Sequence, residues 1–224
     1  VPMVRHFQHD GSQLLPGVRE FVSWLNENGK QFLFLTNSSE RSPKELQQKL
    51  QRMGLDIGEE HFYTSALATA ACEAAHAYGL GSGGSPLVSG HSTANALLDE
   101  AARAYERELV RELGAVPVMD IAVMGMGPDG HYASLFPGHA EVSVTDRLVV
   151  GVNHSPKMPP LRLSMTAPLL AQTRRMWFLT AGAGKADALA HVFTTRNDPA
   201  WPSSFADATG ELVWFTTPDA AAQL

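Results

Sequence analysis

The sequence predicts an α/β fold, in which a mainly parallel, doubly wound (Rossmann-like) sheet carries helices on both faces. Short apolar runs of strand length alternate with longer segments of helical periodicity through almost the whole chain, and this alternation is typical of βαβ units. The chain has 224 residues, 44% of them hydrophobic, which is enough to build one substantial buried core. We therefore expect a single domain over 1–224, organised around one sheet.

The first third of the chain contains short apolar runs that predict strands at 4–7, 31–36 and 61–65. Residues 16–28 place apolar side chains at helical spacing, and Gly29 stands where a C-terminal cap belongs. Ser42 and Glu45 have the spacing of a capping box and predict the start of a second helix. An alanine-rich stretch at 66–77 predicts a third, buried helix.

Residues 79–92 are rich in glycine and serine, which predicts a loop or linker between a first segment, 1–78, and a second segment, 93–224. A helix is expected over 94–113, with its apolar residues along one stripe. Strands and helices then alternate to the end of the chain. The strands are expected at 120–126, 147–152, 162–165, 175–180 and 211–215, and the helices at 168–172, 185–193 and 218–224.

Composition excludes several classes of function. The net charge is −6 and the 17 basic residues are scattered, so the chain offers no broad positive face to a nucleic acid. No segment approaches the ~20 apolar residues that span a bilayer, and the N-terminus lacks the regions of a signal peptide. We expect a cytoplasmic protein that binds neither nucleic acid nor membrane. Its one cysteine, Cys72, cannot form an internal disulfide and is expected in the core.

The strongest candidate site is the glycine-rich turn that follows the strand expected at 120–126. Ligands of open α/β sheets bind at the carboxyl ends of strands. Gly125, Gly127 and Gly130 allow positive φ angles and a close approach of the backbone, and Asp129 and His131 place a carboxylate beside an imidazole. Such a histidine is suited to accept a proton from water. The alternative is a tight turn whose imidazole makes a structural hydrogen bond.

The residues GMGPDGHYASLFPG at 125–138 are very similar to the signature of the 6-phosphogluconolactonases, a branch of the glucosamine-6-phosphate isomerase-like superfamily. The similarity continues through 153–166 and 181–186 and covers about 99–224. It implies a hydrolase of the pentose phosphate pathway that opens 6-phosphogluconolactone, a small phosphorylated sugar, to 6-phosphogluconate. It also implies that His131 is the general base and that no metal or other cofactor is needed. Asp129, beside His131 on the same loop, is the second candidate catalytic residue.

Two groups of residues are expected to hold the substrate of such an enzyme. The amides between Gly125 and Gly130 are candidates for stabilising the carbonyl oxyanion. Lys157 and Arg162 flank a double-proline turn and are the cations expected near the phosphate, although solvation at the surface explains Lys157 equally well. Lys185 lies where a helix N-terminus can hold an anion, but a simple helix cap is the preferred explanation.

The first segment resembles a different family. Asp10-Gly11, the run FLFLTNSS at 32–39 and the run YTSA at 63–66 look like the start of a haloacid dehalogenase-like phosphatase of the nitrophenylphosphatase type, over about 7–75. The resemblance implies that Thr36 and Asn37 bind phosphate. However, Gln8 occupies the place of the nucleophilic aspartate, and a glutamine amide cannot form an aspartyl-phosphate intermediate.

The two resemblances together suggest a chimera, with an engineered fusion as one origin, because the lactonase pattern lacks the G-D-E-R segment of its first half; a natural, highly diverged protein is the alternative origin. Residues 36–39 then stand in for a missing phosphate-binding loop. Three hypotheses follow: a lactonase, with weakened activity as one expectation; a folded scaffold without activity; and a phosphatase, whose magnesium ligands are not recognisable in the sequence. Nothing in the sequence predicts the oligomeric state.

Overall fold

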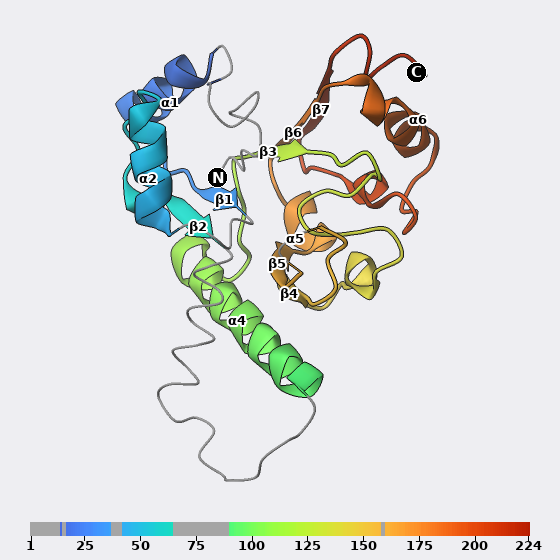
Figure 1. Cartoon of the computed structure of the whole chain (residues 1–224), viewed down its shortest axis with the longest axis horizontal. Coiled ribbons are helices and arrows are strands. Elements are labelled where there is room, and N and C mark those ends of the chain that lie inside the picture. The colour runs from blue at the N-terminus through green and yellow to red at the C-terminus, as the bar shows by residue number, and fades with distance from the viewer. Residues whose placement is uncertain (1–13, 15–16, 37–41, 65–89, 158–159) are drawn as a thin grey trace.

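The computed structural model describes residues 14, 17–36, 42–64, 90–157 and 160–224. It confirms the predicted class, because parallel strands are flanked by helices in an α/β arrangement (Figure 1). Within the described ranges the strands do not form the one sheet that we expected. They form three separate sheets, two parallel and one antiparallel. The interpretation of 1–224 as a single domain stays a prediction.

The first segment forms a small α/β unit around one parallel pair of strands. Its elements are α1 (Val18–Glu27), β1 (Phe34–Thr36), α2 (Pro43–Arg52), η1 (Glu59–His61) and β2 (Phe62–Thr64), with β1 parallel to β2. The predicted capping box is confirmed: the Ser42 hydroxyl accepts the N–H of Glu45, and the Glu45 carboxylate accepts the N–H of Ser42 at 2.7 Å. Apolar residues of both helices and both strands form a buried cluster of their own.

The second segment carries the larger core and the parallel sheet β3-β6-β7. The long helix α4 lies against the antiparallel pair β4-β5, and α6 lies beside the parallel sheet (Figure 1). The bounds are α4 (Gly90–Leu113), β3 (Ile121–Gly125), η2 (Ala140–Ser143), β4 (Val149–Val152), β5 (Arg162–Met165), α5 (Ala167–Ala171), β6 (Arg175–Thr180), η3 (Ala183–Lys185), α6 (Ala186–Thr194), η4 (Pro202–Phe205) and β7 (Glu211–Thr216).

Some expectations are wrong at their edges. The helix expected at 218–224 is absent, and turns follow β7 instead, because so short a stretch does not by itself offset the cost of nucleating a helix. Residues 90–92, expected at the end of the linker, belong to the first turn of α4. The expectations for residues 4–7, 66–77 and 79–89 lie outside the described residues, as does Cys72. No helix of the described ranges has the length and hydropathy to cross a membrane.

Candidate functional site

The candidate site stands at the carboxyl end of β3, which lies at the edge of the parallel sheet. After Gly125 the chain turns back on itself: the N–H of Gly127 donates to the carbonyl of His131 at 2.8 Å, and the N–H of Gly130 donates to the carbonyl of Gly127 at 3.1 Å. Only Gly130 of the three expected glycines has a positive φ, of 73°. A backbone of that shape is costly for any residue with a Cβ atom.

Gly127 is required for a different reason from the one expected. Its φ is not positive, but a Cβ atom there would collide with Nδ1 of His131 and Oδ1 of Asp129. The missing side chain lets both functional groups lie directly over the turn. The amides of Gly127 and Gly130 are both occupied within the turn, so an oxyanion has to be stabilised mainly by other groups.

Asp129 and His131 form a pair. Nδ1 of His131 lies 2.5 Å from Oδ1 of Asp129, and the imidazole is only 5% exposed while the carboxylate is 34% exposed. Burial opposes ionisation of Asp129, but the hydrogen bond from His131 and the positive charges of His131 and Lys157 outweigh it and hold the pKa of Asp129 far below its usual value. An ionised carboxylate only accepts hydrogen bonds, so the proton between the two groups belongs to Nδ1.

Lys157 comes to this pair from the loop between β4 and β5. Its Nζ lies 3.2 Å from Nδ1 of His131 and 3.7 Å from Oδ1 of Asp129. Because Nδ1 carries a proton, the ammonium group interacts mainly with the carboxylate. The Lys157 side chain is 42% exposed, so solvent reaches the cluster over this residue.

Arg162, the other expected cation, is buried at the start of β5. Its Nη2 donates to the carbonyl of Lys157 at 2.7 Å, and its guanidinium carbon lies 5.4 Å from the centre of the Phe136 ring. The same ring lies 4.7 Å from the imidazole of His131. Burial lowers the pKa of Arg162. In this arrangement Arg162 supports the backbone of Lys157, and its expected contact with a substrate phosphate stays a prediction.

Lys185 also extends toward the site. From the sequence, a helix cap is the preferred explanation for this residue, ahead of anion binding. It is the N-cap residue of α6, as the preferred explanation expects, although its side chain makes no capping hydrogen bond. Its Nζ donates instead to the carbonyl of Met126 at 2.6 Å. Burial lowers its pKa, the charge of Lys157 lowers it further, and Asp129 partly offsets both. The charges of Lys157 and Asp129 therefore both influence the pKa of Lys185. In the sequence, the glycine-rich stretch before Lys185 is the only local indication that it could bind an anion.

The structure does not test the residues expected from the phosphatase resemblance. Thr36 ends β1, which pairs with β2 in a sheet separate from β3. Asn37, Gln8 and Asp10 lie outside the described residues. The role of Thr36 and Asn37 in binding phosphate stays a prediction.

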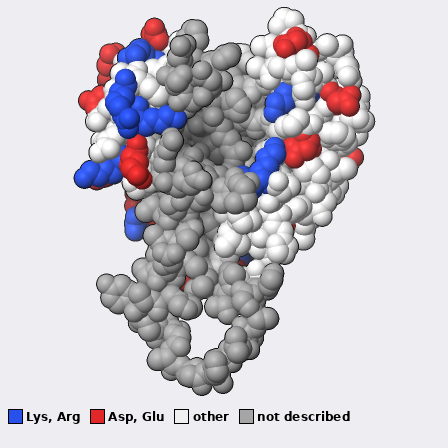
Figure 2. Space-filling model, viewed as in Figure 1, with Lys and Arg blue, Asp and Glu red and all other residues white. Residues whose placement is uncertain are grey.

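The arrangement suits acid–base chemistry on an anionic substrate. A carboxylate holds the proton on one ring nitrogen, which leaves the other nitrogen to accept a proton, and two lysines supply positive charge beside it. Where side chains are described, no group of three or more His, Cys, Asp or Glu residues is arranged to hold a metal ion. On the visible face of the second segment, charged side chains are few and of both signs (Figure 2).

Comparison with known proteins connects this site to one family. The family model described as Glucosamine-6-phosphate isomerases/6-phosphogluconolactonase matches residues 41–214. The chain is 39% identical over 132 residues to a 6-phosphogluconolactonase of Streptomyces coelicolor, covering 57% of this chain and 51% of that protein. For the 6-phosphogluconolactonase of Homo sapiens the identity is 35% over 130 residues, covering 57% and 50%. The chain thus spans about half the length of these curated relatives.

Solved structures have the same fold. A 6-phosphogluconolactonase from Trypanosoma cruzi matches with a TM-score of 0.65 and 22% identity, covering 92% of this chain and 77% of that one. The enzyme from Trypanosoma brucei matches with a TM-score of 0.62 and 19% identity, covering 92% and 78%. The family model begins at residue 41, inside the segment that resembles a phosphatase, so these comparisons give no support to a fused phosphatase segment or a chimera.

Proposed function

Since the chain belongs to the glucosamine-6-phosphate isomerase/6-phosphogluconolactonase family, we propose that it hydrolyses 6-phosphogluconolactone to 6-phosphogluconate. The observation that carries the proposal is the Asp129–His131 pair, whose 2.5 Å contact keeps a proton on Nδ1 and makes Nε2 the basic atom. The curated relatives in the comparison are named 6-phosphogluconolactonases.

In this mechanism His131 acts first as a base and then as an acid. Nε2 accepts a proton from a water molecule while the water oxygen bonds to the lactone carbonyl carbon. The ring C–O bond then breaks, and the imidazolium returns its proton to the departing ring oxygen. Asp129 stabilises the positive charge that the ring carries between the two steps. A lactone is an activated ester, so a positioned base and stabilisation of the oxyanion are the main requirements.

Lys157 and Lys185 supply the positive charge that the substrate needs. Lys157 lies at the Asp129–His131 pair, and Lys185 donates to the carbonyl of Met126 just before the same turn. Neither side chain is fully exposed, which strengthens its interaction with an anion. We assign the phosphate and the developing oxyanion to these two lysines together with Arg162. Gly125, Gly127 and Gly130 shape the turn beneath the substrate.

The test is hydrolysis of 6-phosphogluconolactone by the purified chain, measured against the spontaneous rate. We expect His131→Gln to reduce the enzymatic rate by roughly 10²–10⁴-fold, the usual contribution of a general base. His139→Gln is the control, because the partly exposed His139 lies 3.8 Å from Glu141 and contacts the ring of Phe136, while Nδ1 of His131 contacts Asp129. A wild-type rate equal to the spontaneous one would instead favour a folded scaffold without activity.

Two other substrates separate the remaining alternatives. Release of ammonia from glucosamine 6-phosphate would favour the other activity in the family's description. Magnesium-dependent release of phosphate from p-nitrophenyl phosphate would favour a phosphatase. No observation on the described residues supports that alternative. We expect neither reaction.

A further inference from the structure

We infer that Ser203 is a positioning residue for the Asp129–His131 pair, because it clamps the carbonyl of Gly130, the residue between them, and so holds the turn on which both side chains stand. The kinetic consequence of this inference rests on the proposed function. Its geometric part, that Ser203 controls the contact between Asp129 and His131, does not.

The clamp consists of two hydrogen bonds to one oxygen atom. The backbone N–H of Ser203 and its hydroxyl both donate to the carbonyl of Gly130, each at 2.8 Å. Ser203 is 1% exposed, so water does not compete for these bonds. A buried carbonyl with two donors is fully satisfied, and loss of one donor frees the peptide group to rotate. The contact links residues 73 positions apart, so local sequence does not reveal it.

Trp201 closes the same turn from the side. A Cβ atom on Gly130 would lie 2.8 Å from Cε3 of the indole, so the ring occupies the space that a side chain at Gly130 would need. The indole in turn stacks on His191 of α6, with ring centres 4.3 Å apart and an angle of 9° between the planes. The turn is therefore supported by a ring that is itself held against a helix.

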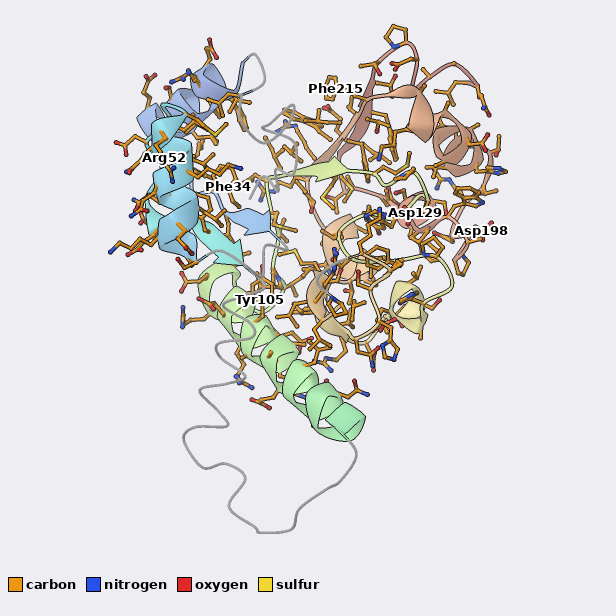
Figure 3. The ribbon with its side chains drawn as sticks, viewed as in Figure 1. Phe34, Arg52, Tyr105, Asp129, Asp198 and Phe215 are labelled. Carbon is orange, nitrogen blue, oxygen red and sulfur yellow. The ribbon has the colours of Figure 1, made fainter. Side chains whose placement is uncertain are left out.

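Hydrogen bonds hold the loop that leads into η4, the short helix that carries Ser203. The Ser204 hydroxyl accepts the N–H of Asp198 at 2.8 Å, and the Asp198 carboxylate accepts the N–H of Ala200 at 2.8 Å. Gly138, beyond the catalytic turn, donates its N–H to the carbonyl of Pro199 at 3.2 Å. Figure 3 labels Asp129 and Asp198, which mark the two loops on the same side of the second segment. Such support from outside the reacting groups is what a precise active-site geometry requires.

The consequence for the pair is specific. Asp129 and His131 flank Gly130. The φ of Gly130 is 73°, an uncommon backbone conformation that persists only when surrounding contacts hold the turn in place. If the Gly130 peptide rotates, the 2.5 Å contact between Nδ1 and Oδ1 lengthens or is intermittently lost. Ser203→Ala removes one of the two donors and leaves the backbone bond in place, so it tests positioning without deleting the loop.

The experiment compares Ser203→Ala with Thr209→Ala, a control that removes a hydroxyl bonded to the carbonyl of Thr173 and not to Gly130 or its supporting residues. The first readout is the downfield proton resonance of the His131 Nδ1–H, assigned by its loss in His131→Gln. We expect Ser203→Ala to move this resonance upfield and to speed its exchange with water, and Thr209→Ala to leave it in place. A resonance unchanged in Ser203→Ala, or absent from the wild type, would overturn the inference.

The second readout is kinetic. We expect kcat for lactone hydrolysis to fall about tenfold in Ser203→Ala with little change in KM, because misplaced groups impair the transition state more than substrate binding. Recovery in Ser203→Thr, which keeps the hydroxyl, is expected. If Ser203→Ala does not fold, Ser203→Cys keeps the shape with a weaker donor and has to give the same shift of the resonance. A wild type without lactonase activity contradicts the proposed function, while the resonance still decides the role of Ser203.

Discussion

The carboxylate of Glu106, on α4, accepts a hydrogen bond from Nε of Arg147 at 2.9 Å. The same oxygen also accepts the backbone N–H groups of Leu148 at 2.8 Å and Val149 at 3.0 Å. Arg147 also donates to Asp99 at 2.9 Å, about two turns nearer the start of α4 and on the same face. The Glu106 side chain thus connects the long helix α4 to the start of β4. The loop after β4 then carries Lys157, so this tie supports the element that brings a cation to the site.

We expect Glu106→Gln to lower the free energy of unfolding by about 2 kcal/mol near pH 7, because a partly buried charge pair loses one partner. Burial opposes ionisation of Glu106, but the hydrogen bonds from Arg147, Val149 and Leu148 prevail, and the pKa lies below its ordinary 4.5. A lowered pKa stabilises the fold above that ordinary value and loses this effect as the pH falls through the folded value.

The difference between wild type and Glu106→Gln should therefore shrink as the pH falls below about 4.5. Urea unfolding at several pH values measures it. Glu108→Gln, an exposed helix residue paired with Arg111, is the control and should change stability by less than about 0.5 kcal/mol. A difference that grew in acid would contradict the assigned direction of the pKa.

Asp129→Asn is expected to reduce kcat for lactone hydrolysis by roughly 10²–10⁴-fold with a small change in KM, because the amide no longer holds the proton on Nδ1 of His131. Steady-state kinetics with subtraction of spontaneous hydrolysis measures the effect. Unfolding of the variant has to be checked in parallel. Retention of the wild-type kcat would mean that the carboxylate does not orient the ring.

Lys185→Gln is expected to raise KM about tenfold, equivalent to about 1.4 kcal/mol of lost binding to the substrate anion. Lys44→Gln, at an exposed position on α2, should leave KM unchanged. The KM of the wild type should also rise with salt, since ions screen the attraction between lysine and phosphate. An unchanged KM in Lys185→Gln would mean that Lys185 does not bind the substrate and that its role is limited to the hydrogen bond with the carbonyl of Met126.

Gly127→Ala is expected to reduce kcat by about a hundredfold or more, since its methyl group would displace the His131 ring and the Asp129 carboxylate. Gly184→Ala is the matched control: its φ is not positive and a Cβ atom there meets nothing within 4 Å. Kinetics and thermal unfolding of the two variants are compared. Equal activity in both would show that the turn yields to the added methyl group.

Local features of the sequence predicted much of the fold. The helices at α1 and α2 and the strands β5 and β6 were expected within a few residues of their bounds, because helical spacing, caps and apolar runs act over neighbouring residues. The expected helix at 218–224 failed, and tertiary contacts hold this segment as turns instead: Ala220 is fully buried, and the N–H of Thr217 donates to the carbonyl of Thr180 at 3.1 Å. The number of sheets could not be predicted either, because strand pairing depends on distant residues.

The sequence by itself determined that a strand ends in a glycine-rich turn bearing Asp129 and His131, since these residues are neighbours in the chain. Only the tertiary structure decided what meets them. Lys157 reaches His131 from 26 residues away, Lys185 reaches Met126 from 59, and Ser203 reaches Gly130 from 73. These contacts arise because packing of the sheet, its helices and the connecting loops brings distant segments together, and sequence periodicity carries no record of such contacts.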